Sequence, residues 1–505
     1  MNNNIGSIPL RYRVTIDRDR CMECERCIEN CSYGVFRRDG DRILINSRKC
    51  TACHRCLAYC PRDAISLEEY PCDYRNHPVW TRQTREDIYN QARTGKIILA
   101  GMGSVSNLPV IFDHLMLDAS QVTTPPTDPL REPVELRTYL GKKPSRLELR
   151  RNPGGDVELA TPLAPNLMLE TPIMLGHMSY GAISLNAQIS MARAAKETGT
   201  YMGTGEGGLH AGLYPYQDRM IVQVASGRFG VNIDYLERGA AIEIKLGQGA
   251  KPGIGGHLTG EKVSKDVSRT RMIPEGSDAI SPAPHHDIYS TEDLSQLVRS
   301  IKEATEWKKP VFAKIAAVNN TAENVAAVAR ASVDAVVIDG FRGGTGAAPK
   351  VFRDHVGIPL EVAIASADRE LSLQGLRNEV SLIACGSIRE SADVVKAIAL
   401  GADAVYIGTA ALVAMGCRVC GNCYQGLCPW GIATQRPDLV QRLDPDVASK
   451  QVANLIRAWT MEITELMGAA GINSIESLRG NRDRLRGYML DENLLRVLDV
   501  KSVGA

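Results

Sequence analysis

Short apolar runs alternate with helical stretches from about residue 173 to residue 407. The apolar runs predict eight strands, at residues 173–176, 200–202, 221–224, 241–245, 311–315, 335–339, 381–385 and 404–407. Helices are predicted at 185–197, 323–331 and 391–400, and Gly199 and Gly401 follow two of them, as left-handed glycines often follow helices. Eight such units over roughly 250 residues predict a (β/α)8 barrel, an α/β fold, with a doubly wound open sheet as the alternative.

The barrel is predicted to occupy residues 166–440, with a polar connector before it and a helical extension behind it. The connector, 71–165, is rich in proline and charge and lacks a long periodic segment, which is typical of an extended wrap. Within it, 101–104 (GMGS) faintly resembles a dinucleotide fingerprint, but the third glycine is missing, so we expect no nucleotide there. In the extension, 441–505, apolar positions of 452–467 share one helical face that we expect to pack on the barrel.

Composition narrows the class of function. The 505 residues carry 59 Lys and Arg against 58 Asp and Glu, and a net charge of +1 gives no electrostatic case for a dedicated nucleic-acid binder. No apolar run approaches the roughly 20 residues that span a bilayer. The start, MNNNIGSIPL, carries no export signal. We therefore expect a cytoplasmic protein that acts on neither nucleic acid nor membrane.

The 14 cysteines change this picture because most of them are clustered. Eight lie between Cys21 and Cys60, four lie between Cys417 and Cys428, and only Cys72 and Cys385 stand apart. In a chain without an export signal such clusters indicate metal ligands rather than disulfides. The first eight form CMECERCIENC and, 29 residues later, CTACHRCLAYCP, which is an internal duplication.

The spacing of this duplication predicts a ferredoxin-like module over residues 1–70 with two [4Fe-4S] clusters. Three thiolates on one tight loop hold three corners of such a cluster, and in two-cluster ferredoxins the fourth comes from the other half. The expected ligand sets are Cys21, Cys24, Cys27 and Cys60 for one cluster, and Cys50, Cys53, Cys56 and Cys31 for the other. Zinc knuckles are the alternative. A module this small is expected to transfer electrons rather than bind a substrate.

Glycine-rich turns follow the last three predicted strands, where (β/α)8 barrels commonly bind a phosphate. The phosphate-bearing group has to accept single electrons from iron–sulfur centres and deliver a hydride, so FMN is the economical choice. Lys245, at the end of the fourth strand, would lie near the pyrimidine edge and stabilise the anionic reduced flavin. The predicted FMN contacts are Met178, Ser179, Gln223, Lys245, Lys314, Gly343, Gly344, Gly386, Ser387, Gly408 and Thr409.

The second cysteine cluster, GCRVCGNCYQGLC, follows the last predicted strand. Its four cysteines, Cys417, Cys420, Cys423 and Cys428, are predicted to hold a further iron–sulfur cluster beside the flavin. A structural zinc site is the alternative. Electrons would then pass from the ferredoxin-like module through this centre to FMN.

Several long motifs of the barrel resemble the flavin-containing synthase region of glutamate synthases. In the same order they are SQVTTPPTDPLRE, MSYGAIS, GEGG, QVASGRFGV, KLGQGAKPGIGGHLTGEKV, SPAPHHDIYS, GGTGAAP and CxxxxxCxxxxCPWGIATQ, from about residue 120 to 435. With the ferredoxin-like module, the chain resembles the large subunit of the short, archaeal-type enzymes. The resemblance implies reduction of 2-iminoglutarate, formed from 2-oxoglutarate and ammonia, to L-glutamate by hydride transfer from FMN.

The resemblance also implies roles for individual residues. Lys251 and Arg271 match residues that hold the 2-oxoglutarate carboxylates, a task suited to paired cations. His257 stands where the longer members have Gln, as a third substrate contact. Glu206 matches a glutamate that couples ammonia arrival to the flavin site. The expected catalytic residues are thus Glu206, Lys245, Lys251 and Arg271.

The C-terminal cluster has two possible forms. Cys417, Cys423 and Cys428 match the three ligands of the family's [3Fe-4S] cluster. Cys420 is additional, which leaves a [4Fe-4S] cluster open.

Partners are implied as well. The chain begins Met1-Asn2, without the cysteine nucleophile of the longer enzymes, and has no convincing NAD(P) fingerprint. We therefore expect ammonia from solution or from a separate glutaminase-type subunit. Electrons are expected from ferredoxin or from a separate NAD(P)H-oxidising flavoprotein subunit.

Three other functions are compatible with parts of the pattern. The first is an N-methylglutamate synthase type of subunit that uses methylamine, and the second is a non-catalytic electron-relay subunit of a larger complex. The third is an IMP-dehydrogenase-like barrel, which needs a nucleophilic cysteine in a catalytic loop, whereas Cys385 lies in a predicted strand.

Overall fold

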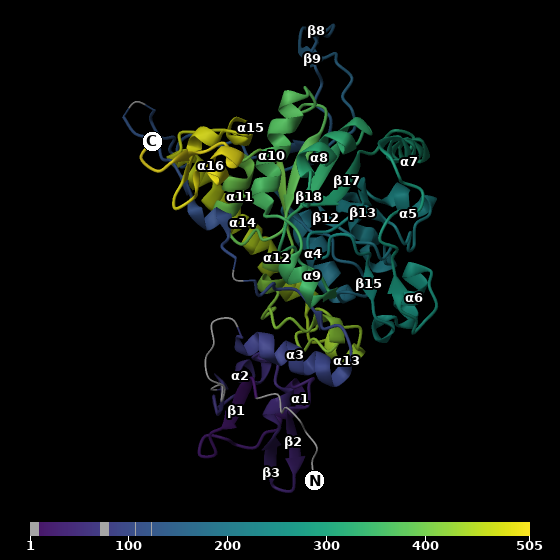
Figure 1. Cartoon of the computed structure of the whole chain (residues 1–505). Helices are drawn as coiled ribbons and strands as arrows, with labels where there is room; N and C mark the ends of the chain where they lie inside the picture. The colour runs from purple at the N-terminus through teal and green to yellow at the C-terminus, as the bar shows by residue number, and fades with distance from the viewer. Residues whose placement is uncertain (1–9, 71–79, 107, 123) are drawn as a thin grey trace.

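The computed structural model describes residues 10–70, 80–106, 108–122 and 124–505. Figure 1 shows a small module at the bottom, a large barrel above it, and C-terminal helices along one side of the barrel. The first nine residues of the chain and Cys72 lie outside the described part. Within the described ranges, no helix combines the length and the apolar character needed to cross a membrane.

Eight parallel strands close into the predicted barrel, so the open-sheet alternative is wrong. In chain order they are β11 (Ile173–Leu175), β12 (Met202–Gly203), β13 (Met220–Ala225), β14 (Ala241–Lys245), β17 (Val311–Ala316), β18 (Ala335–Asp339), β20 (Ser381–Cys385) and β21 (Ala404–Ile407). The ring closes where Ile173 of β11 stands opposite Val405 of β21. Four strands have the predicted bounds and the other four differ by one or two residues at an end. Nearly all strand residues are buried, as expected where both faces of a parallel sheet are covered.

Helices cover the outside of the barrel. Three of them were predicted to within two residues: α4 (Leu185–Glu197), α8 (Thr321–Arg330) and α11 (Ser391–Ala399). Gly401 follows α11 with φ of +125°, and a Cβ there would lie 2.4 Å from the side chain of Asp368. The barrel helices that the sequence pattern did not single out are α5 (Ile233–Arg238), α6 (Lys265–Arg271), α7 (Thr291–Ala304), α9 (Lys350–His355), α10 (Leu360–Leu373) and α12 (Thr409–Ala414).

The cysteine-rich module is built from two similar halves. Its elements are β1 (Tyr12–Ile16), α1 (Arg26–Asn30), β2 (Phe36–Asp39), β3 (Arg42–Ile45), α2 (Arg55–Ala58) and β4 (Ile65–Glu69), with β1 antiparallel to β4 and β2 antiparallel to β3. The duplication extends to the backbone, since left-handed Glu23 and Glu25 recur 29 residues later as left-handed Ala52 and His54. The cysteine loops of the two halves therefore share one backbone shape.

The connector contains a helix that the sequence pattern did not predict, α3 (Arg82–Thr94). Its residues are mostly polar, so no apolar periodicity marks it in the sequence. Contacts to both neighbouring parts of the chain hold it. Arg82, its first residue, donates to the Tyr70 carbonyl of the module at 2.7 Å, and Asp87 pairs with Lys350 of the barrel. Tertiary contacts rather than an apolar face therefore stabilise α3 between the two parts.

Short strands complete the connector and the loops. The pairs are β5 (Leu99–Ala100) with β19 (Ala348–Pro349), β6 (Leu115–Leu117) with β22 (Leu485–Gly487), β7 (Thr138–Leu140) with β10 (Leu167–Leu169), β8 (Leu149–Arg151) with β9 (Val157–Leu159), β15 (His257–Leu258) with β16 (Ala279–Ile280), and β22 with β23 (Lys501–Ser502). The β8–β9 hairpin stands away from the barrel at the top of Figure 1.

The predicted amphipathic helix of the extension lies within α14 (Pro445–Ala469), which packs on α4 and α11. The predicted face is buried at Val452, Ile456, Trp459 and Ile463. The helix begins earlier than predicted because Asp444 caps it and proline is well tolerated in the first helical turn. Short helices flank it: α13 (Pro437–Val440), α15 (Ile475–Leu478) and α16 (Glu492–Leu498).

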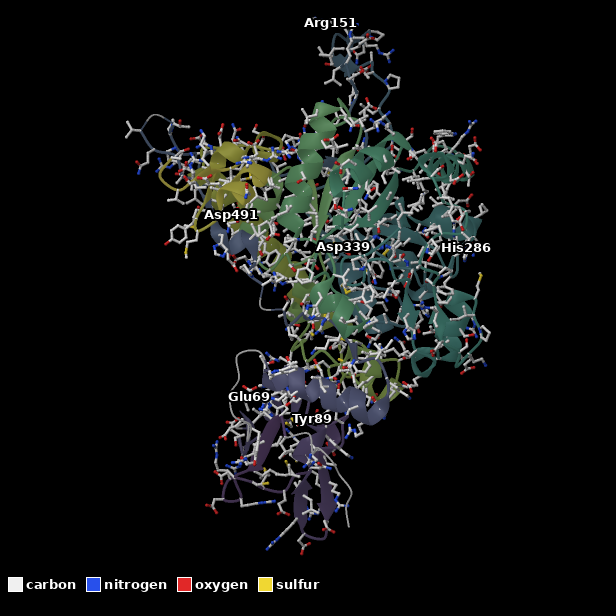
Figure 2. The ribbon with its side chains drawn as sticks, viewed as in Figure 1. Glu69, Tyr89, Arg151, His286, Asp339 and Asp491 are labelled. Atoms are coloured by element: carbon white, nitrogen blue, oxygen red, sulfur yellow. The ribbon has the colours of Figure 1, made fainter. Side chains whose placement is uncertain are left out.

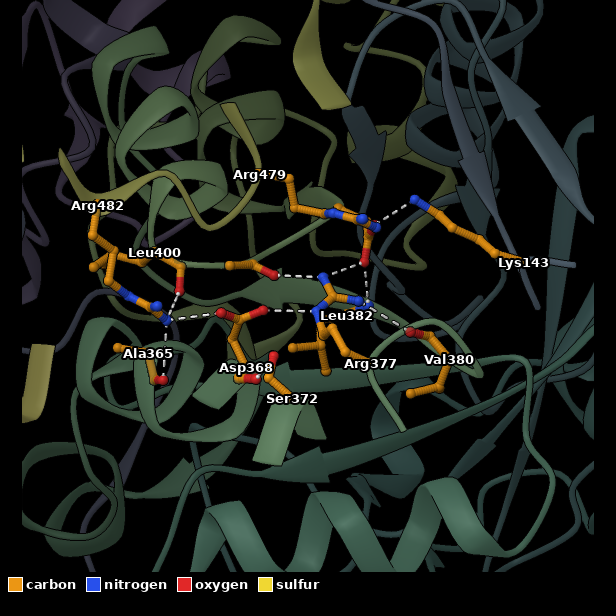
Figure 3. Close-up of polar contacts among 12 residues, drawn as sticks. Lys143, Ala365, Asp368, Ser372, Arg377, Val380, Leu382, Leu400, Arg479 and Arg482 are labelled. Atoms are coloured by element: carbon orange, nitrogen blue, oxygen red, sulfur yellow. Dashed lines mark hydrogen bonds and ion pairs between the residues drawn. The ribbon is translucent and has the colours of Figure 1, made fainter. Parts of the chain in front are cut away.

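A buried network of charges joins this extension to the barrel, at the amino ends of the strands (Figure 3). Asp403, directly before β21, accepts from Arg377 at 2.9 Å and from Arg479 at 2.8 Å. Asp368 accepts from Arg377 at 2.7 Å and from Arg482 at 2.8 Å. The extension is thus held to the end of the barrel opposite its catalytic loops.

Candidate active site

A cavity of about 480 Å³ lies at the carboxyl ends of the barrel strands. Its walls come from the turns that follow the strands and from the C-terminal cysteine loop, residues 417–428. Asp339, the last residue of β18, lines it near the middle of Figure 2. A cavity of this size is within the range of cofactor and substrate sites.

Ten of the eleven predicted FMN contacts line this cavity: Met178, Ser179, Gln223, Lys245, Lys314, Gly344, Gly386, Ser387, Gly408 and Thr409. Gly343 is the exception. A Cβ at Gly343 would lie 2.7 Å from Asp339 Oδ1, so close packing accounts for that glycine. The geometry therefore brings together side chains from seven of the eight strands or the turns that follow them.

The glycine turns leave space for an anion. A Cβ on Gly408 would meet no atom within 4 Å, so the approach to its backbone is open. Gly386 has φ of +105° and Ser387, which follows it, has φ of +61°. Consecutive N–H groups in such conformations form concavities that suit a phosphate.

Four buried polar atoms of the cavity wall have no hydrogen-bond partner within the described chain. They are Tyr33 Oη, His257 Nε2, Thr259 Oγ1 and Asp339 Oδ1, and His257 Nε2 lies 3.5 Å from Asp278 Oδ2. Buried polar atoms are nearly always paired in native proteins, and a bound ligand is one way to pair them. Together with the open glycine turns, these atoms fit a site that holds a polar cofactor or substrate.

Glu206 and Lys245 form an ion pair inside the cavity. Lys245 donates from Nζ to Glu206 Oε2 at 3.2 Å. Burial alone would raise the pKa of Glu206, but the charges of Lys245, Arg271 and Lys251 outweigh it and lower the pKa below its ordinary value. An ionised, buried glutamate therefore lies beside the lysine predicted to face the flavin.

The long loop after β14 brings Lys251 and His257 to the cavity. Lys251 is 3% exposed, and its Nζ donates to the Ala347 carbonyl at 3.1 Å. Burial, helped by the charge of Lys245, lowers the pKa of Lys251 to about 8. Among the described residues this carbonyl is its one hydrogen-bond acceptor, so donors of the ammonium group remain for a ligand.

Arg271 lies beside the cavity rather than in its wall. It ends α6, is 2% exposed, and donates to the Tyr180 carbonyl at 2.8 and 3.1 Å and to Ser179 Oγ at 3.0 Å. Burial lowers the pKa of Arg271 to about 10. Its hydrogen bonds fix the turn after β11, and Ser179 carries that effect to the cavity surface. Its role toward substrate stays a prediction.

Charged side chains fill the barrel interior below the ion pair. Glu243 accepts from Gln223 Nε2 at 2.7 Å and lies 3.3 Å from His177 Nε2. Lys314 lies 3.0 Å from Asp339. Burial would lower the pKa of Lys314, but the Asp339 carboxylate in particular raises it above its ordinary value. The floor of the cavity is therefore polar and held rigidly by paired charges.

The two adjacent histidines of the long loop lie apart from the cavity wall. His285 is buried and its Nε2 lies 2.7 Å from the Lys245 carbonyl, so it fixes the loop against β14. Burial lowers the pKa of His285. His286 is exposed on the outer side of the barrel in Figure 2.

The module gathers its cysteines across its two halves. One small cavity is lined by the predicted first set, Cys21, Cys24, Cys27 and Cys60. The second set is also close together. Burial is the main cause of the raised pKa of Cys50, Cys53 and Cys56, and the charge of Cys31 contributes to the rise in all three. The cysteines of each predicted set are thus close together, and the exchange of the fourth ligand stays a prediction.

All four cysteines of the C-terminal loop line the main cavity: Cys417, Cys420, Cys423 and Cys428. The connector supports this loop at Gly101, whose N–H donates to the Gly421 carbonyl at 2.7 Å. A Cβ at Gly101 would lie 2.9 Å from Cys423 Sγ. A Cβ at Gly103 would lie 2.6 Å from Val419, so close packing against the cysteine loop explains both glycines of 101–104.

The module and the cysteine loop meet directly. Trp430 Nε1 donates to the Cys53 carbonyl at 3.0 Å, and Ser32 Oγ donates to the Leu427 carbonyl at 2.6 Å. Burial is the largest cause of the raised pKa of Cys53, and the charges of Cys31, Cys50 and Cys428 raise it further. The second cysteine set of the module therefore lies next to the C-terminal loop.

Three residues of this region escaped the sequence analysis: Lys262, Tyr33 and Trp430. Lys262 lies within the quoted loop motif and donates to the Cys423 carbonyl at 2.6 Å and the Ala182 carbonyl at 3.3 Å. Tyr33 lines the main cavity although it belongs to the module. Tyr33 and Trp430 each stand two positions after a cluster cysteine, and that adjacency was the only sequence signal available.

A family model described as the conserved region in glutamate synthase matches residues 106–473. A 4Fe-4S dicluster domain model matches residues 13–61, which bears out an iron–sulfur module against zinc knuckles. These two matches span the barrel and the module in turn.

Curated relatives match over nearly the whole chain. An archaeal glutamate synthase [NADPH] of Methanocaldococcus jannaschii is 67% identical over 504 residues, covering 98% of this chain and 99% of the relative. An archaeal-type glutamate synthase [NADPH] of Thermotoga neapolitana is 56% identical over 499 residues, covering 98% of each. The glutamate synthase [NADPH] large chain of Bacillus subtilis is 38% identical over 318 residues, covering 61% of this chain and 21% of that longer protein.

Solved structures add little to these matches. A mandelate oxidase variant aligns with a TM-score of 0.46 and 15% identity, covering 77% of this chain and 92% of its own.

Proposed function

Because the chain belongs to the glutamate synthase family, in its archaeal-type branch, we propose that it reduces 2-iminoglutarate, formed from 2-oxoglutarate and ammonia, to L-glutamate. One observation supports this most: a single cavity is lined by the predicted flavin contacts, by Lys251 and His257, and by the C-terminal cysteine loop. Nothing in the relatives' names favours methylamine as the amine or a purely electron-relaying role.

FMN is the proposed cofactor of this cavity. The open approach to Gly408 and the left-handed Gly386 and Ser387 suit its phosphate. When bound, FMN supplies hydride chemistry and exchanges single electrons with iron–sulfur centres. Lys245 would hold positive charge next to its ring, and Glu206 keeps that lysine oriented through the 3.2 Å ion pair.

The substrate is proposed to lie above the flavin against Lys251. Its buried ammonium group retains donors suited to a carboxylate. His257 offers Nε2, which has no hydrogen-bond partner within the described chain, to the same ligand. Arg271 is proposed to act from behind, by holding Ser179 and the Tyr180 carbonyl in place. These cations are buried, so the proposed site shields a reactive imine from water.

The proposed electron route runs through the module in a fixed order. The set with Cys50, Cys53 and Cys56 adjoins the C-terminal loop, because Trp430 contacts the Cys53 carbonyl and Cys428 acts on Cys53. The set with Cys21, Cys24, Cys27 and Cys60 belongs to the other end of the module, where Cys24 is exposed. Electrons would enter at this exposed set and leave through the other.

We propose that the C-terminal loop holds a [4Fe-4S] cluster. Cys420 lines the same cavity as Cys417, Cys423 and Cys428, and burial raises its pKa as it does for Cys417 and Cys423. A fourth thiolate at this place offers the fourth corner that a [3Fe-4S] cluster lacks.

Two partners are proposed beyond the chain. The relatives' names include NADPH, so a separate NADPH-oxidising flavoprotein is the proposed first source of electrons, with ferredoxin as the other donor to test. Ammonia is proposed to come from solution or from a separate glutaminase-type subunit.

A single-turnover experiment tests the function. The anaerobic protein is reduced chemically, freed of reductant, and mixed with 2-oxoglutarate and ammonium, methylamine or glutamine in parallel. We expect L-glutamate and reoxidised flavin with ammonium alone. Product with methylamine only would make the chain an N-methylglutamate synthase type, and no product with any amine would leave the relay function.

A further inference from the structure

Lys262 is a buried lysine at the junction of three segments. Its side chain is 3% exposed and lines the main cavity. It comes from the long loop after β14, donates to the Cys423 carbonyl at 2.6 Å in the cysteine loop, and donates to the Ala182 carbonyl at 3.3 Å in the turn after β11. The roles proposed above for the site residues use none of these contacts.

The charge of Lys262 needs a counter-charge. Burial lowers the pKa of Lys262 to about 8, and the charged or ionisable groups that act on it within the described chain are Cys423, Cys428 and Arg271, none of them a carboxylate. Burial of an ammonium group without an anionic partner is unfavourable. The two carbonyls accept two of its three N–H donors, which leaves one donor for a further acceptor.

We propose that Lys262 is the counter-charge of the iron–sulfur centre in the C-terminal loop and raises the reduction potential of that centre. This inference rests on the proposed function, since it requires iron in the loop. Reduction adds negative charge to the centre, and a fixed cation beside it in a water-poor site stabilises the reduced form. Lys262 is thus a positioning residue that acts on the cluster rather than on substrate.

The placement has a second consequence for the same residue. Lys262 shares its loop with Lys251 and His257, so the loop that would bind substrate also carries the cation of the cluster. Binding and potential are then linked, because a ligand that moves the loop also moves this charge. We expect 2-oxoglutarate to shift the potential of the C-terminal centre in the native protein and to have a smaller effect without the cation.

The test is a redox titration of the anaerobic full chain, followed by electron paramagnetic resonance. Lys262→Met removes the charge and keeps the length of the side chain, whereas Lys262→Arg keeps the charge. Lys265→Met is the matched control, since Lys265 is exposed three residues further along. Iron and flavin content are measured on each preparation.

We expect Lys262→Met to shift the C-terminal centre to a more negative potential, with the module's clusters unchanged. Lys262→Arg should restore most of the native value, and Lys265→Met should match the native protein. An unchanged potential in Lys262→Met with full iron content overturns the proposal, as does an equal shift in Lys265→Met.

If Lys262→Met loses the cluster, the iron content of Lys262→Arg decides the question. Retention of iron by Lys262→Arg would support a requirement for charge, whereas equal loss in both variants would indicate a requirement for shape and overturn the proposal. Absence of iron from the loop of the native protein is a different result, which would refute the proposed function itself.

Discussion

The indole Nε1 of Trp430 donates a hydrogen bond to the backbone carbonyl of Cys53 at 3.0 Å. Trp430 follows the C-terminal cysteine loop, and Cys53 belongs to the second cysteine set of the module. Arg55, 5% exposed, lies with its guanidinium 5.1 Å from the Trp430 ring centroid and so excludes water from the same contact. The two cysteine-rich segments, far apart in sequence, therefore meet through this hydrogen bond and through the one from Ser32 Oγ to the Leu427 carbonyl.

Replacing Trp430 by Phe is expected to slow electron passage between these segments. The lost hydrogen bond is worth about 1 kcal/mol, which corresponds to about a fivefold slower flavin reduction if it acts fully on the transfer step. Stopped-flow measurement of flavin reduction by a reduced low-potential protein donor checks this. Trp307→Phe is the control, since Trp307 is exposed on the barrel. Equal rates in the native protein and Trp430→Phe would refute the proposed route.

The affinity for 2-oxoglutarate is expected to depend on pH through Lys251. Burial lowers the pKa of Lys251 to about 8, and only its protonated form attracts a carboxylate. The dissociation constant should therefore be constant below about pH 7 and rise as pH increases through 8, up to about tenfold per pH unit. Equilibrium binding is the right measurement, because turnover also reflects the ionisation of ammonia.

Two variants separate Lys251 from other titrating groups. Lys251→Arg should remove the rise, because a guanidinium keeps its charge at these pH values. Lys251→Gln should weaken binding about 10- to 100-fold at pH 7, the loss of a charged hydrogen bond. A pH profile that is the same in the native protein and Lys251→Arg would show that Lys251 does not bind the substrate.

Asp403→Asn is expected to destabilise the fold without touching the catalytic end of the barrel. Asp403 is 3% exposed and pairs with Arg377 and Arg479, so removal of its charge leaves buried cations unpaired at a cost of about 3–5 kcal/mol. Denaturant unfolding of the native and variant chains measures this. Asp438→Asn breaks an exposed pair with Arg436 and should cost less than about 1 kcal/mol.

The same residue gives stability a pH dependence of known sign. Burial would raise the pKa of Asp403, but Arg377 and Arg479 outweigh it and hold the pKa below its ordinary value. Because the pKa of Asp403 is depressed in the folded state, its carboxylate stabilises the protein at pH values above the unfolded-state pKa of 3.8. This stabilisation is lost as pH falls through the folded-state pKa. The native chain should therefore lose more stability than Asp403→Asn on acidification below about pH 4.

Cys420→Ser is expected to convert the C-terminal centre from a four-iron to a three-iron cluster. The other three thiolates remain, and they match the spacing that holds three irons. The oxidised variant should gain the paramagnetic signal of a three-iron cluster and lose about one iron per chain. A native protein that already shows this signal at full strength would refute the proposed fourth ligand.

The barrel could be predicted well because each of its strands is marked by a short apolar run, and this local pattern repeats along the chain. Short apolar runs such as 335–339 and 381–385 became β18 and β20 with their bounds unchanged. The helix α3 escaped because it is stabilised by Arg82 and Asp87 across the interface, and its sequence lacks an apolar stripe. A tertiary contact of that kind leaves no periodicity to read.

The site was predicted in part for the same reason. Glycine turns and cysteine spacings are short-range patterns, and the structure gathers ten of the eleven predicted flavin contacts and the four cysteines of the C-terminal loop around one cavity. Arg271, expected to hold a substrate carboxylate, lies beside the cavity with its guanidinium bonded to Ser179 and the Tyr180 carbonyl, and its role toward substrate stays a prediction. Lys262 was not predicted because its role depends on a contact with Cys423, more than a hundred residues away.

Metal and flavin analysis of the anaerobically purified full chain is the decisive measurement. Three four-iron clusters and one flavin require about twelve iron atoms, matched by acid-labile sulfide, and about one FMN per chain. Zinc in place of iron at either cysteine-rich segment, or a preparation without flavin after cofactor-replete expression, would rule out electron transfer from iron–sulfur clusters to FMN in this protein.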